Sequence, residues 1–301
     1  MNGKFTIPCG DAAVRAAYEA IAGAAPARVR RVCERWGDGE DDVRRYDVYF
    51  VDGGGETRVL KKTDARETAV YDLLATARGL PAPVRFGKHE AKDGVWMLLE
   101  YVPGDDLSEM TDALALAAAD SLAAIANRFW QKDAAEFAAK KCDDRFERYH
   151  ARILRRAAFP EDGSALRRAY QLFLDRQETC PRTLCCGDFL PGNAIWDGAR
   201  VVIVDWGFGG VMPYALDVAR FIAHATPGKS TFPFYMTDAH KRLFLDRVYE
   251  KLDRRPERAQ YERDVRLALL NEYVEFVEAD EDESGWYRAH AEALARELLA
   301  E

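Results

Sequence analysis

The sequence predicts an α+β protein of two parts, an antiparallel sheet with one helix followed by a mainly helical half. Three observations predict this fold class. Strand-like patterns fill most of residues 28–62 and return at 83–86 and 94–101. One helical pattern, at residues 64–80, lies between these strands. Beyond residue 105, alanine, leucine and charged residues dominate long stretches with helical periodicity.

Five strands make up the predicted sheet. The first three are RVRRVCERW, RRYDVYFVDG and GETRVLKK, and the glycines at 53–55 form the turn between the last two. The helix DARETAVYDLLATARGL is stopped by Gly79 and Pro81. The fourth strand follows it, and the fifth, VWMLLEY, ends before Pro103-Gly104. We therefore expect an N-terminal lobe over residues 1–102 and a helical C-terminal lobe over 103–301, around a shared cleft.

Composition excludes several classes of protein. The net charge of −8 argues against a nucleic-acid binder, which needs basic surface to neutralise phosphates. No segment approaches about 18 consecutive apolar residues, and the first twenty residues lack a basic region followed by an apolar run. We therefore expect neither secretion nor a membrane span. The six cysteines form no CxxC pair, which indicates reduced, mostly buried thiols in a cytoplasmic protein.

One non-helical stretch, residues 183–212, interrupts the helical half. Asp188 and Asn193 stand five positions apart with proline and glycine between them, which predicts an irregular loop. Two short strands joined by the turn Asp197-Gly198 follow, and the second delivers Asp205 at its end. Transfer of a phosphoryl group to a hydroxyl requires a carboxylate to receive the proton and oxygen ligands for Mg²⁺. These three side chains supply that set.

The spacing D-x-x-x-x-N followed by D-x-G resembles the catalytic and metal loops of the kinase superfamily. Gly187-Asp188 and the later Asp217, in PYALDVARF, narrow the resemblance to aminoglycoside phosphotransferases and choline kinases. It implies a bilobal protein-kinase-like fold and an enzyme that uses ATP and Mg²⁺ to phosphorylate a hydroxyl of a small polar molecule. It also implies Asp188 as the catalytic base and Asn193 and Asp205 as magnesium ligands.

Each of these three residues also has a simpler interpretation. Asp188 and Asn193 could merely shape a turn, and Asp205 could cap the segment after it. In addition, Cys186 stands where the family usually has a histidine before Gly-Asp. We expect Cys186 to pack as a small apolar residue in its place. The alternative is a pseudokinase, which binds nucleotide as a module and has weak or no turnover.

The N-terminal half offers nucleotide-binding residues on the same resemblance. A kinase fold needs a cation on the third strand, held by a helix carboxylate, to grip the nucleotide's phosphates. Alternation along RVLKK puts Lys61 on the face of Val59, with Lys62 as the second candidate, and Glu67 is the expected partner. Taken alone, this pair could be a solvated surface pair. The resemblance further implies that backbone groups of Glu100, Tyr101 and Val102 hydrogen-bond the base.

Three further segments are weighed against the kinase hypothesis. Residues 36–43, WGDGEDDV, lie where a phosphate-covering loop belongs, although their glycines do not make the fuller pattern. PGKS, at 227–230, lacks the glycine that a P-loop requires, so it is set aside. The acidic run in residues 275–283 could face a cationic acceptor, but a solvated helix end is the preferred interpretation. The sequence specifies neither the acceptor nor the oligomeric state.

Overall fold

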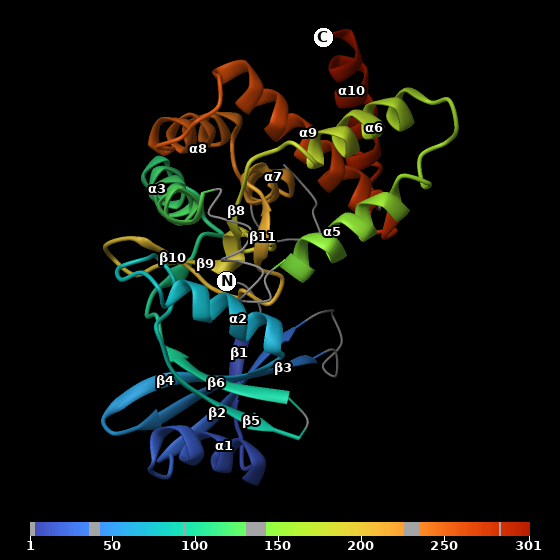
Figure 1. Ribbon diagram of the computed structural model, residues 1–301. Coiled ribbons are helices and arrows are strands. Elements are labelled where there is room, and N and C mark those ends of the chain that lie inside the picture. Colours follow the sequence, from blue (N-terminus) through green and yellow to red (C-terminus); the bar gives the residue numbers. More distant parts are fainter. Residues whose placement is uncertain (1–3, 36–42, 93, 131–142, 226–234, 283) are drawn as a thin grey trace.

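The computed structural model describes residues 4–35, 43–92, 94–130, 143–225, 235–282 and 284–301. It confirms the α+β fold, with an antiparallel sheet in the N-terminal part and a helical C-terminal part. Figure 1 shows the sheet at one end of the molecule and most of the helices at the other. The predicted division at residue 102 stays a prediction.

The sheet has six strands in the order β1-β2-β3-β4-β6-β5, not the predicted five. The additional strand β1 pairs antiparallel with β2 at the edge of the sheet. Its five residues, KFTIP, are too few to establish a strand by alternation alone, and pairing with β2 stabilises it. The strands are β1 (Lys4–Pro8), β2 (Arg28–Arg35), β3 (Val43–Gly53), β4 (Glu56–Thr63), β5 (Arg85–Ala91) and β6 (Gly94–Glu100).

Helices α1 (Ala12–Ala22) and α2 (Ala65–Leu74) cover the sheet. The sequence prediction missed α1, which is capped by the carboxylate of Asp11 and ends at Gly23 in the left-handed conformation. Helix α2 ends before the predicted stop at Gly79. Leu60 and Trp96 pack in one buried cluster with α1, whereas Met97 on the opposite face joins the core shared by α2 and the helical half.

The second half is built from helices packed around the non-helical stretch. Strands β9 and β10 form the predicted antiparallel hairpin, but four residues connect them, because Val201 pairs with Trp196. Strand β7 extends this hairpin to three strands, and β8 pairs with β11. The elements are β7 (Asp105–Asp106), α3 (Asp112–Phe129), α5 (Asp143–Arg156), α6 (Ala165–Gln177), β8 (Arg182–Cys185), the 3₁₀ turn η1 (Pro191–Asn193), β9 (Ala194–Trp196), β10 (Val201–Ile203), β11 (Gly210–Pro213), α7 (Ala215–Ala223), α8 (Asp238–Lys251), α9 (Arg258–Glu278) and α10 (Trp286–Ala300).

A continuous apolar core joins the two parts. Val70 and Leu73 of α2 belong to the same buried cluster as Phe173 of α6 and Phe221 of α7. The end of the hairpin is anchored in it by Trp206, whose side chain is fully buried and donates its indole N–H to the carbonyl of Ile203 at 2.9 Å. None of the helices within the described ranges combines the length and apolar character that a membrane crossing requires.

Candidate active site

Lys61 connects the sheet to the hairpin of the second half. Its Nζ lies 2.7 Å from Oε1 of Glu67, at the start of α2, and 2.7 Å from Oδ1 of Asp205, just after β10. The Glu67 side chain is only 2% exposed, so the interpretation of Lys61 and Glu67 as a solvated surface pair is wrong. Lys62 points to the other face of the sheet, where its Nζ lies 5.7 Å from the centre of the Trp96 ring.

The charges of this cluster stabilise one another. Burial lowers the pKa of Lys61, but the carboxylates of Asp205 and Glu67 outweigh it, and the pKa is raised above the ordinary value. Desolvation opposes ionisation of Asp205, yet the Lys61 ammonium and the Gly207 N–H hold the pKa of its carboxyl below its usual range. Lys61 and Asp205 are therefore both charged at neutral pH.

Asp188 and Asn193 contact each other directly. The side-chain amide of Asn193 donates to the carbonyl of Asp188 at 2.9 Å and to its Oδ2 at 3.1 Å. Since Nδ2 faces Asp188, Oδ1 of Asn193 is turned away from it. The turn-forming interpretation of these residues is thus met in part, because Asn193 bonds both the main chain and the carboxylate of Asp188.

Main-chain contacts hold Asp205 against this loop. The N–H of Val204 donates to the carbonyl of Asn193 at 2.9 Å. The thiol of Cys186 donates to the carbonyl of Asp205 at 3.3 Å. Asp205 itself has a φ of 58°, a left-handed conformation that aspartate tolerates better than bulkier residues. The structure therefore brings Asp188, Asn193 and Asp205 together on adjoining loops.

A buried carboxylate on α7 shapes the loop that carries Asp188. Asp217 accepts the backbone N–H of Cys186 at 2.6 Å and that of Gly187 at 2.9 Å. Burial raises the pKa of Asp217 to about 7 in spite of these two donors. The side chain of Cys186 is fully buried in the main core, as expected for a small apolar residue. Burial also raises the pKa of its thiol, which therefore stays neutral.

The arrangement fits magnesium held together with a phosphate ligand. The described residues contain no group of three or more His, Cys, Asp or Glu side chains that could hold a metal alone. Mg²⁺ needs none, because it typically takes one or two protein carboxylates and completes its shell with water and phosphate oxygens. Asp205 offers a carboxylate that is 53% exposed. Gly207 keeps the adjoining space open, since a Cβ there would lie 3.4 Å from Oδ1 of Asp205 and 4.0 Å from Nζ of Lys61.

The residues expected to bind the base lie at the end of β6 and just after it. Glu100 donates its backbone N–H to the carbonyl of Val84 at 2.8 Å, so it has only its carbonyl to offer a base. Tyr101 is 37% exposed and packs edge-on against Phe50. Residues 36–42 of the expected phosphate-covering loop lie outside the described residues.

Comparisons with known proteins identify the family and the fold of the chain. A family model described as the phosphotransferase enzyme family, APH, matches residues 42–253. The chain belongs to that family. It is therefore a phosphotransferase, and the residues of the cluster and loops above all fall inside the matched segment. A search of curated proteins finds no match.

Solved structures show the same fold at low sequence identity. An aminoglycoside-3'-phosphotransferase of type VIII matches with 18% identity and a TM-score of 0.54 over 86% of this chain and 98% of its own. An amicoumacin kinase in complex with AMP-PNP, Ca²⁺ and Ami matches with 12% identity and a TM-score of 0.57 over 88% of this chain and 87% of its own. An ethanolamine kinase of Plasmodium vivax matches with 10% identity and a TM-score of 0.54 over 99% of this chain and 81% of its own.

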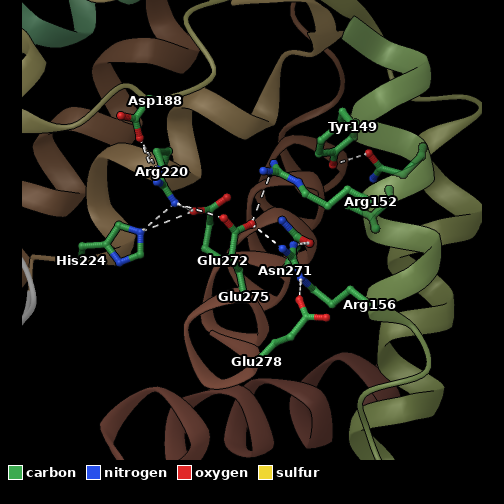
Figure 2. A network of polar contacts seen from close by, with 12 residues as sticks. Tyr149, Arg152, Arg156, Asp188, Arg220, His224, Asn271, Glu272, Glu275 and Glu278 are labelled. Carbon is green, nitrogen blue, oxygen red and sulfur yellow. Dashed lines mark hydrogen bonds and ion pairs between the residues drawn. The ribbon is translucent and has the colours of Figure 1, made fainter. Parts of the chain in front are cut away.

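Arg220, His224 and Glu272 lie behind Asp188 in this phosphotransferase. The sequence analysis did not assign these three polar residues to the site. Arg220 of α7 donates Nε and Nη2 to Oδ1 of Asp188 at 3.1 and 2.8 Å, and Nη1 to Glu272 of α9 at 2.7 Å. His224 lies beside both (Figure 2). Arg220 could have been found, because it follows Asp217 by one helical turn on the same face of α7. No neighbouring residue or motif in the sequence marks Glu272 as part of the site.

The late acidic run does not act as one surface. Glu275 and Glu278 are ion-paired with Arg156 of α5, at 2.8 and 2.7 Å (Figure 2). Asp282 caps α10 by accepting the backbone N–H groups of Tyr287 and Arg288. Ion pairing and capping, rather than solvation alone, therefore account for these carboxylates.

Gly187→Ala tests the loop geometry. Gly187 has a φ of +77°, and a Cβ there would lie 2.3 Å from the carbonyl oxygen of Phe208. We expect the substitution to lower the free energy of unfolding by about 2 kcal/mol or more, measured by urea denaturation. Gly10→Ala is the matched control, because a Cβ there meets nothing within 4 Å. Equal stability of the two variants would contradict the described loop.

His224→Gln tests whether His224, which lies behind Asp188, is neutral in the folded protein. Burial lowers the pKa of His224 to about 4, whereas histidine in an unfolded chain has a pKa of about 6.5. The unfolded state therefore binds an extra proton as pH falls from about 6.5 to 4, and stability is lost over that window. Relative to wild type, the variant should lose about 2 kcal/mol less between pH 7.5 and 5.

The measurement is urea unfolding at a series of pH values. His290→Gln serves as the control, because His290 is exposed on α10. Identical pH dependence of wild type and His224→Gln would show that His224 is not neutral in the folded phosphotransferase.

Proposed function

We propose that this phosphotransferase uses ATP and Mg²⁺ to phosphorylate a hydroxyl of a small polar molecule. The observation that carries the proposal is the joint arrangement of the Asp205–Lys61–Glu67 cluster with the Asp188–Asn193 pair. One part provides a cation for phosphates, and the other provides a carboxylate for a proton. Membership of the family supports the same reaction class.

Asp188 acts as the catalytic base in this proposal. The acceptor hydroxyl gives its proton to the Asp188 carboxylate while the hydroxyl oxygen forms a bond to the terminal phosphorus of ATP. The bond between that phosphorus and the bridging oxygen breaks, and its electron pair stays on the ADP oxygen. Positioning of the two reactants and stabilisation of the moving charge account for most of the catalysis.

Lys61 holds the nucleotide's α and β phosphates, and Glu67 keeps its ammonium in place. The carbonyl of Glu100 and the backbone groups of Tyr101 and Val102 face the base. Asn193 and Asp205 hold the metal. When bound, Mg²⁺ neutralises phosphate charge that would otherwise repel the two carboxylates of the cluster.

The proposal specifies the acceptor only by its chemical class, a small polar molecule with a hydroxyl group. The neighbours named above include a kinase of aminoglycosides and one of ethanolamine, all of them small polar molecules with hydroxyls. In this proposal the acceptor pocket lies among the helices that follow Ser108 and Pro227. A cytoplasmic location fits it, because ATP is supplied there.

Asp188→Ala tests the base. We expect turnover to fall by about 10²–10⁴-fold, because the general base is removed, while the dissociation constant for ATP stays within about threefold of wild type. ADP release across a panel of aminoglycosides, choline, sugars and amino alcohols measures turnover, and calorimetry measures binding. Asp162→Ala is the control, because its side chain is 93% exposed and far from the cluster in sequence.

Two results would contradict this assignment. Near-wild-type turnover of Asp188→Ala would mean that another group receives the proton. Thermal stabilisation of wild type by ATP, with neither hydrolysis nor transfer to any acceptor, would favour the pseudokinase.

Asp205→Asn tests the metal site. Asparagine tolerates the left-handed backbone but removes the negative charge that Mg²⁺ prefers. We expect the Mg²⁺ concentration for half-maximal activity to rise at least about tenfold, and EDTA to abolish activity of the wild-type enzyme reversibly. An unchanged Mg²⁺ requirement in the variant would assign the metal to other ligands.

A further inference from the structure

Arg220 occupies one oxygen of the proposed base. Its Nε and Nη2 both donate to Oδ1 of Asp188, at 3.1 and 2.8 Å. Asn193 donates to the other oxygen, Oδ2, at 3.1 Å. A carboxylate otherwise rotates about two side-chain torsions, and donors on both oxygens remove that freedom. The orientation of the Asp188 carboxylate is therefore set by Arg220 together with Asn193.

The guanidinium is itself fixed from behind. Its third nitrogen, Nη1, donates to Oε2 of Glu272 at 2.7 Å and lies 3.3 Å from Nε2 of His224. Figure 2 shows the order Asp188, Arg220, Glu272, with the His224 ring beside the last two. Burial raises the pKa of Glu272, but the charge of Arg220 outweighs it and lowers the pKa below its ordinary value. Glu272 is thus ionised, and Arg220 lies between two carboxylates.

The planar shape of the guanidinium matters here as much as its charge. Its five N–H donors form a rigid fork, which fixes the directions of several hydrogen bonds at once. A lysine ammonium would supply the charge but not this geometry. Packing alone does not require an arginine either, because buried ion pairs can often be replaced by apolar residues without loss of stability.

Counting acceptor sites shows which oxygen remains available. A carboxylate offers about four lone-pair positions. Arg220 takes both at Oδ1 of Asp188, and Asn193 takes one at Oδ2. Within the part of the chain that the structure describes, these donors leave one position, which belongs to Oδ2, next to the Asn193 side chain that we assign to the metal.

We propose that Arg220 is a positioning residue that directs Oδ2 of Asp188 toward the acceptor hydroxyl, and that Glu272 acts by holding Arg220 in place. This inference rests on the proposed function and deepens it. The acceptor's proton goes to Oδ2, while Oδ1 stays hydrogen-bonded to Arg220 throughout the transfer. Arg220 itself touches neither the acceptor nor the nucleotide.

The test compares Arg220→Lys and Arg220→Met with a matched pair elsewhere in the helical half. Arg176 of α6 likewise donates Nε and Nη2 to a carboxylate, that of buried Asp264, but to its two oxygens Oδ1 and Oδ2, at 2.7 and 3.0 Å. Arg176→Lys and Arg176→Met therefore report the stability effect of losing such a pair. Steady-state kcat and KM, the dissociation constant for ATP and the melting temperature are measured for all four variants.

We expect both Arg220 variants to lower kcat by about 10²-fold or more, since a displacement of about 1 Å at the reacting groups has effects of that size. The KM for ATP should stay within about threefold of wild type. The Arg176 variants should lower the melting temperature similarly but leave kcat within about twofold. Wild-type kcat in Arg220→Lys would overturn the orienting role, because charge alone would then suffice.

The double variant Arg220→Met with Glu272→Gln tests the anchor. If Glu272 acts only through Arg220, kcat of the double variant equals that of Arg220→Met. If the decrease in kcat of the double variant equals the product of the decreases in Arg220→Met and Glu272→Gln, the role of Glu272 in holding Arg220 is overturned. Failure of the proposed function gives a different result. In that case the wild-type protein transfers phosphate to no acceptor, and the proposed role of Arg220 is overturned with it.

Discussion

The contact of Lys61 with two carboxylates is the interaction on which the site depends. Its partners come from α2, six residues away, and from the end of β10, 144 residues away. One ammonium thus ties the sheet to the loops of the helical half. Both carboxylates contact the same ammonium at 2.7 Å, and the Asp205 side chain is 53% exposed. The same contacts that join the two parts therefore bring Lys61, Glu67 and Asp205 together in the candidate site.

The loops around Asp188 are held by side chains and isolated backbone contacts rather than by regular structure. Asp217 accepts two consecutive N–H groups, and Asn193 and Arg220 fix the Asp188 carboxylate. Such loops lack the repeated hydrogen bonds of a helix or a strand, so each contact contributes separately to their shape. Their rigidity comes from α7, whose buried face presents Asp217 and Arg220 one turn apart. A helix thus shapes the loop that carries Asp188.

Local patterns predicted the features that local chemistry determines. Alternation along β4 put Lys61 and Val59 on one face, and the motif placed Asp188, Asn193 and Asp205 in one non-helical stretch. Strand β1 was missed because KFTIP is short and its stability comes from pairing with β2. Helix α1 was missed as well, although Asp11 and Gly23 mark its two ends in the sequence. Glu272 could not be found, because it reaches Arg220 from α9 only once the chain has folded. His224 follows Arg220 by one helical turn and therefore carries the same local signal as Arg220.

The central claim is that Asn193 and Asp205 converge on one metal beside the nucleotide. Crystals grown with Mn²⁺ and a non-hydrolysable ATP analogue test it most directly, because the anomalous signal of Mn²⁺ locates the ion independently of the protein. The account predicts one ion that lies within about 2.3 Å of both Oδ1 of Asn193 and the Asp205 carboxylate and is bonded to phosphate oxygens. An ion bound to the nucleotide but to neither side chain would contradict it.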